Sequence, residues 1–174
     1  MLRAAVVVPI VRYSEPAIVF VRRAAHLRRS PGDLAFPGGV IDLADGDDPL
    51  VTALREFEEE LGVDRARVEI VAQLEEVETR ALSTRLTPYL GTLDPPVAWR
   101  PDPAETQSVH EVPLAALYAP GAVHEGTHSL ERNGRRWVVE SWLFDYDELH
   151  VWGASARILS MLLTRYPHLG TLPL

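Results

Sequence analysis

Residues 48–62 constrain the fold more than any other segment, because they specify a helix together with both of its ends. Asp48 is a good N-cap, Pro49 suits the first helical position, and Gly62 can close the helix as a C-cap. The apolar residues of the segment recur at helical spacing and form one stripe; they are Leu50, Leu54, Phe57 and Leu61. The segment therefore predicts an amphipathic helix whose apolar stripe faces the protein core.

The remainder of the chain predicts strands and helices that do not alternate regularly. Runs rich in β-branched residues predict strands, which lie at 6–11, 17–21, 68–73 and 86–93. Further expected elements are a short strand and loop at 40–46, a hairpin turn at 132–135, and helices at 112–118 and 154–166. The length of 174 residues fits one domain. We expect a single α+β domain over residues 1–174, an α/β/α sandwich with a mixed sheet between helices.

Composition and charge exclude several functions. The net charge of −8 argues against nucleic-acid binding, which depends on cations that meet phosphates. The chain contains no Cys and no Lys, so thiolate nucleophiles, Schiff bases and the lysine of P-loop enzymes are excluded. The apolar run Ala4–Val11 is far shorter than the ~20 residues that span a bilayer, and no cleavage pattern of a signal peptide follows it. We therefore expect a cytoplasmic protein without a membrane partner.

Three glutamates share one face of the predicted helix. Glu56, Glu59 and Glu60 occupy an arc of about 100° beside the apolar stripe, whereas Glu58 lies on the other flank. Carboxylates this close repel one another, and Mg²⁺ or Mn²⁺ is the natural counter-charge, because hard divalent cations prefer oxygen ligands. Arg55, four residues before Glu59, can brace that carboxylate. The alternative from the helix alone is a solvated acidic face that holds no metal.

The context of this helix carries a family resemblance. The stretch Arg55-Glu56-Phe57-x-Glu59-Glu60-x-Gly62-Val63, preceded by Gly38-Gly39, resembles the signature of the Nudix hydrolases. The second half of the signature matches at every specified position. In the first half, Asp47 stands where the signature has Glu, and the spacing from Gly39 to Arg55 is two residues longer.

An upstream stretch narrows the resemblance to the coenzyme A pyrophosphatases of that family. Their additional motif is matched here by Arg23, Ala24, Arg28, Gly32 and the run 36–39, and residues 151–159 are similar to that subfamily as well. Arg23 and Arg28 supply fixed cations for an anionic substrate, although they could also be ordinary surface arginines.

This resemblance implies the Nudix fold, with the catalytic helix at about 48–62, and hydrolysis of a phosphoanhydride. The substrate would be coenzyme A or a derivative, split into 3′,5′-ADP and 4′-phosphopantetheine with Mg²⁺ or Mn²⁺ as cofactor. Glu56, Glu59 and Glu60 would hold the metal. The catalytic candidates are Glu59, Glu60, Glu105 and Arg55, and the substrate-binding candidates are Arg23, Arg28, Phe36, Gly38 and Gly39.

Several alternatives remain open in the sequence. The substrate could be ADP-ribose, NADH or a dinucleoside polyphosphate, and a nucleotide-sensing module without turnover is a further possibility. Glu111 competes with Glu105 as the acidic residue beyond the helix, and Asp45 competes with Asp47 in the loop before it. The general base, the preferred metal, the preferred coenzyme A derivative, and the choice between monomer and homodimer are not determined.

One other motif, at residues 124–128, lacks the context that its usual function needs. Residues 124–128 fit the His-Glu-x-x-His pattern of zinc peptidases, but that pattern functions on a helix. Because this segment follows Pro120-Gly121 and contains Gly126, it predicts a loop with two surface histidines.

Overall fold

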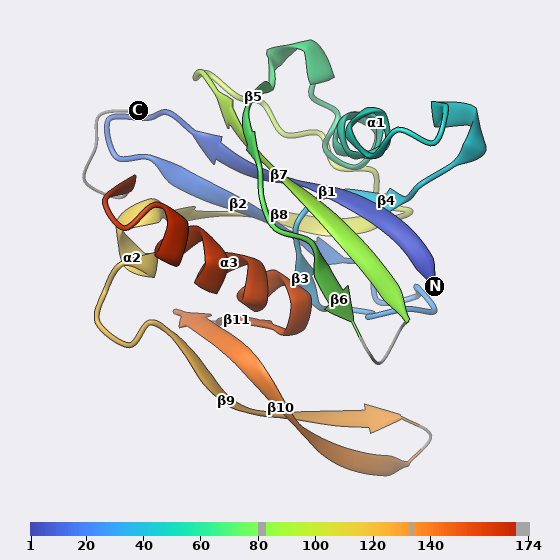
Figure 1. Cartoon of the computed structure of the whole chain (residues 1–174), viewed down its shortest axis with the longest axis vertical. Coiled ribbons are helices and arrows are strands. Elements are labelled where there is room, and N and C mark those ends of the chain that lie inside the picture. Colours follow the sequence, from blue (N-terminus) through green and yellow to red (C-terminus); the bar gives the residue numbers. More distant parts are fainter. Residues whose placement is uncertain (80–82, 133, 170–174) are drawn as a thin grey trace.

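The computed structural model describes residues 1–79, 83–132 and 134–169 (Figure 1). The strands are β1 Leu2–Val11, β2 Ala17–Arg23, β3 Leu34–Ala35, β4 Gly38–Val40, β5 Glu69–Gln73, β6 Val77–Thr79, β7 Thr84–Leu93, β8 Thr106–Pro113, β9 Val123–Arg132, β10 Arg135–Tyr146 and β11 Leu149–Trp152. The α-helices are α1 Pro49–Leu61, α2 Leu114–Leu117 and α3 Gly153–Arg165, and short 3₁₀ turns span Leu43–Asp45 and Arg65–Arg67. The expected α+β class is confirmed.

The central sheet is mixed. Its strand order is β3-β2-β1-β7-β5, and β4, β6 and β8 pair with β1, β7 and β2 respectively. β1 runs parallel to β7 from Leu2 opposite Thr84 to Val11 opposite Leu93, and the other pairings of this sheet are antiparallel. The first strand of the chain therefore lies in the middle of the sheet.

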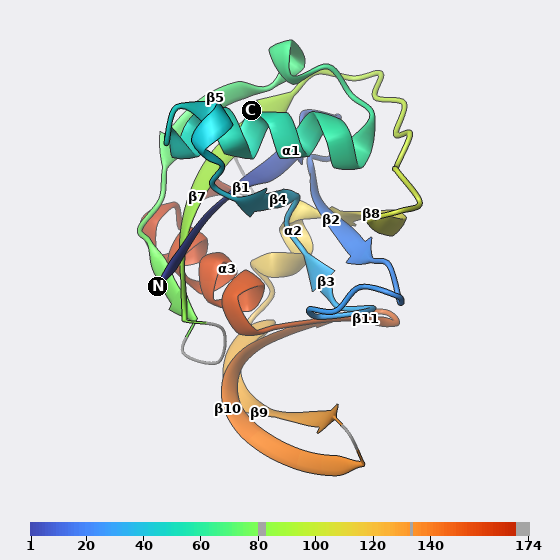
Figure 2. The ribbon, with the colours of Figure 1, turned by 90° about the vertical axis from the view of Figure 1, so that its right-hand side faces the viewer.

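Alternation along β1 explains why helices cover both faces of this sheet. Ala5 and Val7 point to the face that packs against α1, where Phe57 is fully buried. Val6 and Val8 point to the opposite face, where they share a core with residues of α3 such as Leu159. Figure 2 shows α1 on one side of the sheet and α3 on the other. The α/β/α arrangement is thus built from β-strands whose two faces are both apolar.

Helix α1 begins and ends where the sequence places it. The Asp48 side chain accepts a hydrogen bond from the Leu50 amide at 2.9 Å, and Gly62 closes the helix with a positive φ of 63°. Phe57 and Leu61 of the predicted stripe are fully buried, and Leu50 and Leu54 pack at its margin. The helix is therefore fixed in rotation by its apolar stripe.

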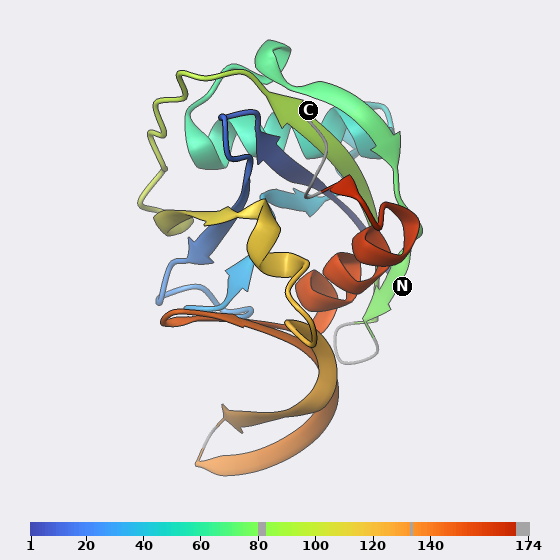
Figure 3. The ribbon, with the colours of Figure 1, turned by 90° about the vertical axis from the view of Figure 1, so that its left-hand side faces the viewer.

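A second sheet, ordered β11-β10-β9, extends from the body as a long hairpin (Figure 3). The predicted turn at 132–135 includes Asn133, which lies outside the described residues, but Arg132 and Arg135 face each other as the hairpin requires. The loop expected at His124–His128 is wrong, because these residues belong to β9. Pairing with β10 over ten residues outweighs the turn tendency of Gly126.

One boundary differs from expectation. The strand β8 was not predicted, and it extends through Pro113, so only Leu114–Leu117 of the expected helix at 112–118 is helical. Residues 40–46 form the end of β4 and a loop with a 3₁₀ turn, in line with the short strand and loop expected there. Among the described helices, none is both long and apolar enough to cross a bilayer.

Candidate active site

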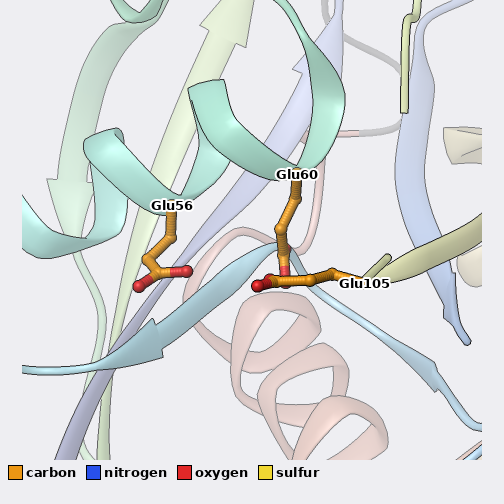
Figure 4. A group of neighbouring side chains, drawn as sticks. All are labelled: Glu56, Glu60 and Glu105. Carbon is orange, nitrogen blue, oxygen red and sulfur yellow. The ribbon is translucent and has the colours of Figure 1, made fainter. Parts of the chain in front are cut away.

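Three carboxylates converge at the edge of helix α1. Glu56 and Glu60 lie on the helix, and Glu105 is the residue just before β8 (Figure 4). One oxygen from each lies within 4.8 Å of the others. An ion bound at about 2.1 Å separates opposite ligands by at most about 4.2 Å, so small side-chain rotations suffice for the three to share one divalent cation. The donor set therefore fits Mg²⁺ or Mn²⁺.

Glu60 is the buried member of this trio. Only 3% of the residue is exposed, and its Oε2 accepts a hydrogen bond from the Gly38 amide at 3.0 Å. Burial raises the pKa of Glu60 to about 8, although the Gly38 amide and the nearby Arg23 charge act in the opposite direction. A buried carboxyl with so little compensation gains strongly from a cation beside it.

The glycine turn, defined as the bend at Pro37 together with Gly38 and Gly39 at the start of β4, leaves room for these carboxylates. A Cβ at Gly39 would lie 2.4 Å from the carboxyl carbon of Glu56, closer than atoms can approach. A Cβ at Gly38 would lie 2.2 Å from the carbonyl oxygen of Ala5 on the neighbouring strand. Gly38 is therefore required by the sheet, whereas a side chain at position 39 would fit only if the Glu56 carboxylate moved.

Arg55 organises the solvent side of the helix. Its guanidinium pairs with Glu56 at 2.9 Å and with Glu59 at 2.8 Å, and it binds both carboxylate oxygens of Asp45. The Arg55 hydrogen bond, followed by one from Thr52, lowers the pKa of Asp45 to about 2. Sequence reasoning left Asp45 unassigned, and its place beside Arg55 could have been found only from the fold of the preceding loop.

The structure separates Glu59 from the two helical residues with which it was grouped. Glu56 and Glu60 are four residues apart, or about 40° around the helix, whereas Glu59 lies about 60° from Glu56 in the other direction. Its side chain is 57% exposed and pairs with Arg55, outside the trio. The position that completes the trio is instead Glu105.

The competing acidic residues lie elsewhere. Glu111 accepts hydrogen bonds from the hydroxyl of Tyr13 at 3.0 Å and from the indole nitrogen of Trp99 at 2.7 Å. Asp47 pairs with Arg3 at 2.8 Å on the surface. Neither belongs to the acidic trio, so the structure favours Glu105 over Glu111 and leaves Asp47 outside the site.

The predicted substrate-binding residues have different surroundings. The charge of Arg23 acts to lower the pKa of Glu60, and its Nε donates to the carbonyl of Arg29 at 3.4 Å. Arg28 is exposed and forms no ion pair with any described side chain. Phe36 is buried and stacks on Phe20 at 4.9 Å between ring centroids, so its side chain supports the glycine turn from the core.

A second cluster of titratable groups lies on the hairpin sheet. His150 binds Asp145 through Nδ1 and His128 through Nε2, the latter at 3.0 Å, and His128 stacks on Trp152 at 3.9 Å. Burial, followed by the proximity of His150, lowers the pKa of His128. His124 and His128 are four residues apart on one strand, about 13 Å, so the His-Glu-x-x-His pair cannot share a zinc ion.

The comparisons with known proteins agree with this architecture. The model of the NUDIX domain matches residues 1–134. A Salmonella paratyphi B protein named "uncharacterized Nudix hydrolase NudL" is 36% identical over 160 residues, which cover 92% of this chain and 80% of that protein. The corresponding protein of Salmonella newport matches equally well.

Solved structures show the same fold at low sequence identity. A MutT/nudix family protein of Enterococcus faecalis aligns with a TM-score of 0.61 and 15% identity, over 95% of this chain and 62% of the other. A Caenorhabditis elegans Ap4A hydrolase complex aligns with a TM-score of 0.55 and 21% identity, over 64% and 80%. The NUDIX domain of Shewanella oneidensis NrtR with ADP-ribose aligns with a TM-score of 0.55 and 22% identity, over 67% and 75%.

The mixed sheet and its covering helices are therefore shared with these structures as a fold. The chain belongs to the Nudix family and is one of its pyrophosphohydrolases.

Proposed function

We propose that this enzyme hydrolyses the phosphoanhydride of coenzyme A or one of its derivatives, with 3′,5′-ADP and 4′-phosphopantetheine as products. The observation that carries the proposal is that the segment with Arg23 and Arg28 is hydrogen-bonded to the segment of Glu105, because the Ala24 amide donates to the Glu105 carbonyl at 2.9 Å. Multiply phosphorylated substrates need both features, a cation site at the bridging phosphates and fixed positive charges for the outer ones.

Glu56, Glu60 and Glu105 would hold Mg²⁺ or Mn²⁺. Bound there, the metal supplies charge neutralisation at the phosphoanhydride and lowers the pKa of water. Glu60 is oriented by the Gly38 amide and Glu56 by Arg55, so two of the three carboxylates are already fixed by the fold. A carboxylate of this acidic face accepts the proton of the attacking water, and the glycine turn lets the substrate approach the backbone closely.

The substrate is identified by an assay of the purified protein with Mg²⁺ or Mn²⁺. The panel contains coenzyme A, ADP-ribose, NADH and diadenosine polyphosphates, and chromatography resolves the products. ADP-ribose and Ap4A are included because the names of structural neighbours contain them. We expect the highest kcat/KM with coenzyme A or its acyl or oxidised forms. Turnover of ADP-ribose with no reaction of coenzyme A would contradict the assignment.

The role of Arg28 can be separated from general charge effects. A charge-assisted hydrogen bond contributes about 1.5–3 kcal/mol, which is roughly 10- to 150-fold in kcat/KM. We expect the wild type to prefer coenzyme A over 3′-dephospho-coenzyme A and Arg28→Ala to lose most of that preference. Arg29→Ala is the matched control, because it removes the neighbouring exposed guanidinium but keeps the carbonyl that binds Arg23. Equal preference in wild type and in Arg28→Ala would exclude Arg28 from 3′-phosphate recognition.

A further inference from the structure

The segment from 24 to 33 forms a closed loop between β2 and β3. Its ends are joined by two backbone hydrogen bonds, from Arg23 to the carbonyl of Asp33 at 2.9 Å and from Gly32 to the carbonyl of Arg23 at 3.0 Å. The guanidinium of Arg22 also binds the carbonyl of Gly32 at 3.0 Å. The loop is thus held as one unit, and it carries Arg28.

The same loop is tied to the segment that carries Glu105. The Ala24 amide donates to the carbonyl of Glu105 at 2.9 Å, and the His26 ring contacts the carbonyl of Ala104 through Nε2 at 2.9 Å. Because the acceptor is a carbonyl, His26 must carry a proton on Nε2. Both the matching neutral tautomer and the imidazolium satisfy this requirement, so the contact does not depend on the charge of His26.

Glu105 is the member of the trio that most needs such support. Glu56 and Glu60 are on a well-packed helix, whereas Glu105 is an exposed residue of a loop. The loop is connected to the helix through its backbone, since the Asp102 amide donates to the carbonyl of Glu60 at 3.2 Å. Besides the Ala24 amide, which binds the Glu105 backbone itself, the His26 ring is the side chain that holds the residue directly before Glu105.

We propose that His26 is a positioning residue that joins the arginine-bearing loop to the third carboxylate of the metal site. This rests on the proposed function insofar as the trio binds the metal. The His26 contact already fixes the 104–105 segment. Glu105 therefore loses less conformational entropy when it binds a cation. Because the contact belongs to the loop of Arg28, substrate that orders this loop also favours metal binding, and the reverse holds by linkage.

The first test measures Mn²⁺ affinity by isothermal titration without any nucleotide. We expect His26→Ala to bind Mn²⁺ about 3- to 10-fold more weakly, in line with the loss of one hydrogen bond. His26→Gln should recover most of the affinity, because its amide can still donate to Ala104. His124→Ala is the matched control: it removes an exposed histidine that contacts only the carbonyl of Gly121 among the described residues.

A double-mutant cycle with Glu105→Gln tests whether His26 acts through Glu105. In the Glu105→Gln background, His26→Ala should cause no further loss of Mn²⁺ affinity, whereas independent effects would multiply. In activity assays, His26→Ala should raise the Mn²⁺ concentration needed for half-maximal rate more than it lowers kcat at saturating Mn²⁺.

The outcomes separate this inference from the proposed function. Unchanged Mn²⁺ affinity in His26→Ala, together with weaker binding in Glu105→Gln, would overturn the role of His26 alone. Fully multiplicative losses in the cycle would also overturn it. If Mn²⁺ binding were insensitive to both Glu105→Gln and Glu60→Gln, the metal site itself, and with it the proposed function, would be wrong.

Discussion

Two clusters of titratable side chains in the described part of the chain are stabilised in opposite ways. In the trio of Glu56, Glu60 and Glu105, like charges converge and the buried member has a pKa raised to about 8. In the hairpin cluster, Asp145, His150 and His128 already provide one another with donors and acceptors. In our proposal a divalent cation completes the first cluster, whereas the side chains of the second satisfy one another. The difference teaches that a buried acidic group with a strongly shifted pKa, rather than a concentration of ionisable groups, points to a functional site.

The elements that carry the two clusters also differ in how firmly they are held. Helix α1 is fixed to the central sheet by buried residues such as Phe57, and the glycine turn meets the trio from the other side. The hairpin cluster is on a sheet that extends from the body (Figure 3), and its histidines are partly or fully exposed. Catalytic positions need the first kind of support, because geometry must be held within a fraction of an ångström.

The largest effect should come from Glu60→Gln. Removing the buried charge removes a metal ligand, and we expect kcat to fall by at least ~100-fold, as is typical for loss of such an electrostatic group. Glu58→Gln is the matched control on the same helix, because Glu58 faces Arg65 at 3.5 Å and should retain nearly full activity. Steady-state kinetics at several Mg²⁺ concentrations provides the measurement. Similar losses in both variants would remove the contrast between the two faces of the helix.

Gly39→Ala should come next. The added methyl would displace the Glu56 carboxylate, so we expect a loss of more than ~10-fold in kcat and weaker Mn²⁺ binding, with little change in melting temperature. Val40→Ala is the neighbouring control, since Val40 is 46% exposed. A Gly39→Ala enzyme with normal affinity for Mn²⁺ would show that Glu56 is not held by this turn.

In metal-free protein, the buried carboxyl of Glu60 should lower the free energy of unfolding at high pH. A carboxyl whose pKa rises from 4.5 to about 8 on folding binds its proton more tightly in the folded state. The free energy of unfolding therefore falls as pH increases through this interval. We expect Glu60→Gln, with metal removed by chelation, to melt several degrees above the wild type at pH 8 and close to it at pH 4.5. A pH-independent difference would exclude Glu60 as the cause.

The smallest effect should come from His150→Gln. The cluster on the hairpin is complete without a ligand, so kcat and KM should stay within about twofold of the wild type. A loss comparable to that of Glu60→Gln would erase the distinction between the two clusters.

Much of the site could be predicted because its signals are local. The caps of α1 and the spacing of Glu56 and Glu60 depend only on neighbouring residues, and the structure places both carboxylates together. Glu59 was grouped with them because the three lie within an arc of about 100°; in the structure its side chain pairs with Arg55, and its role as a metal ligand stays a prediction. Glu105 could be named as a candidate, but its contact with the helix depends on tertiary structure.

The unpredicted elements depend on distant partners. β8 follows a proline-rich stretch and owes its conformation to pairing with β2, from Ala17 opposite Pro113 to Arg23 opposite Thr106. Residues 124–128 contain Gly126 and lack a strong apolar alternation, so only pairing with β10 makes them a strand. Asp45 and Arg55 illustrate the same limit for side chains, because they are ten positions apart and Asp45 belongs to the 3₁₀ turn that precedes the helix.

The parallel pairing of β1 with β7 also has a consequence for how the protein folds during its synthesis. Leu2 lies opposite Thr84, so the middle of the sheet joins segments that are synthesised far apart in time. During translation, β1 must wait without its parallel neighbour until Leu93 has left the ribosome, and closing so long a loop makes folding slow. In that interval β1 exposes an apolar strand, from Ala4 to Val11, that could associate with other chains. Helix α1 is complete before β7 is synthesised and can cover one face of this strand in the interval, while β2 and β4 pair with its edge.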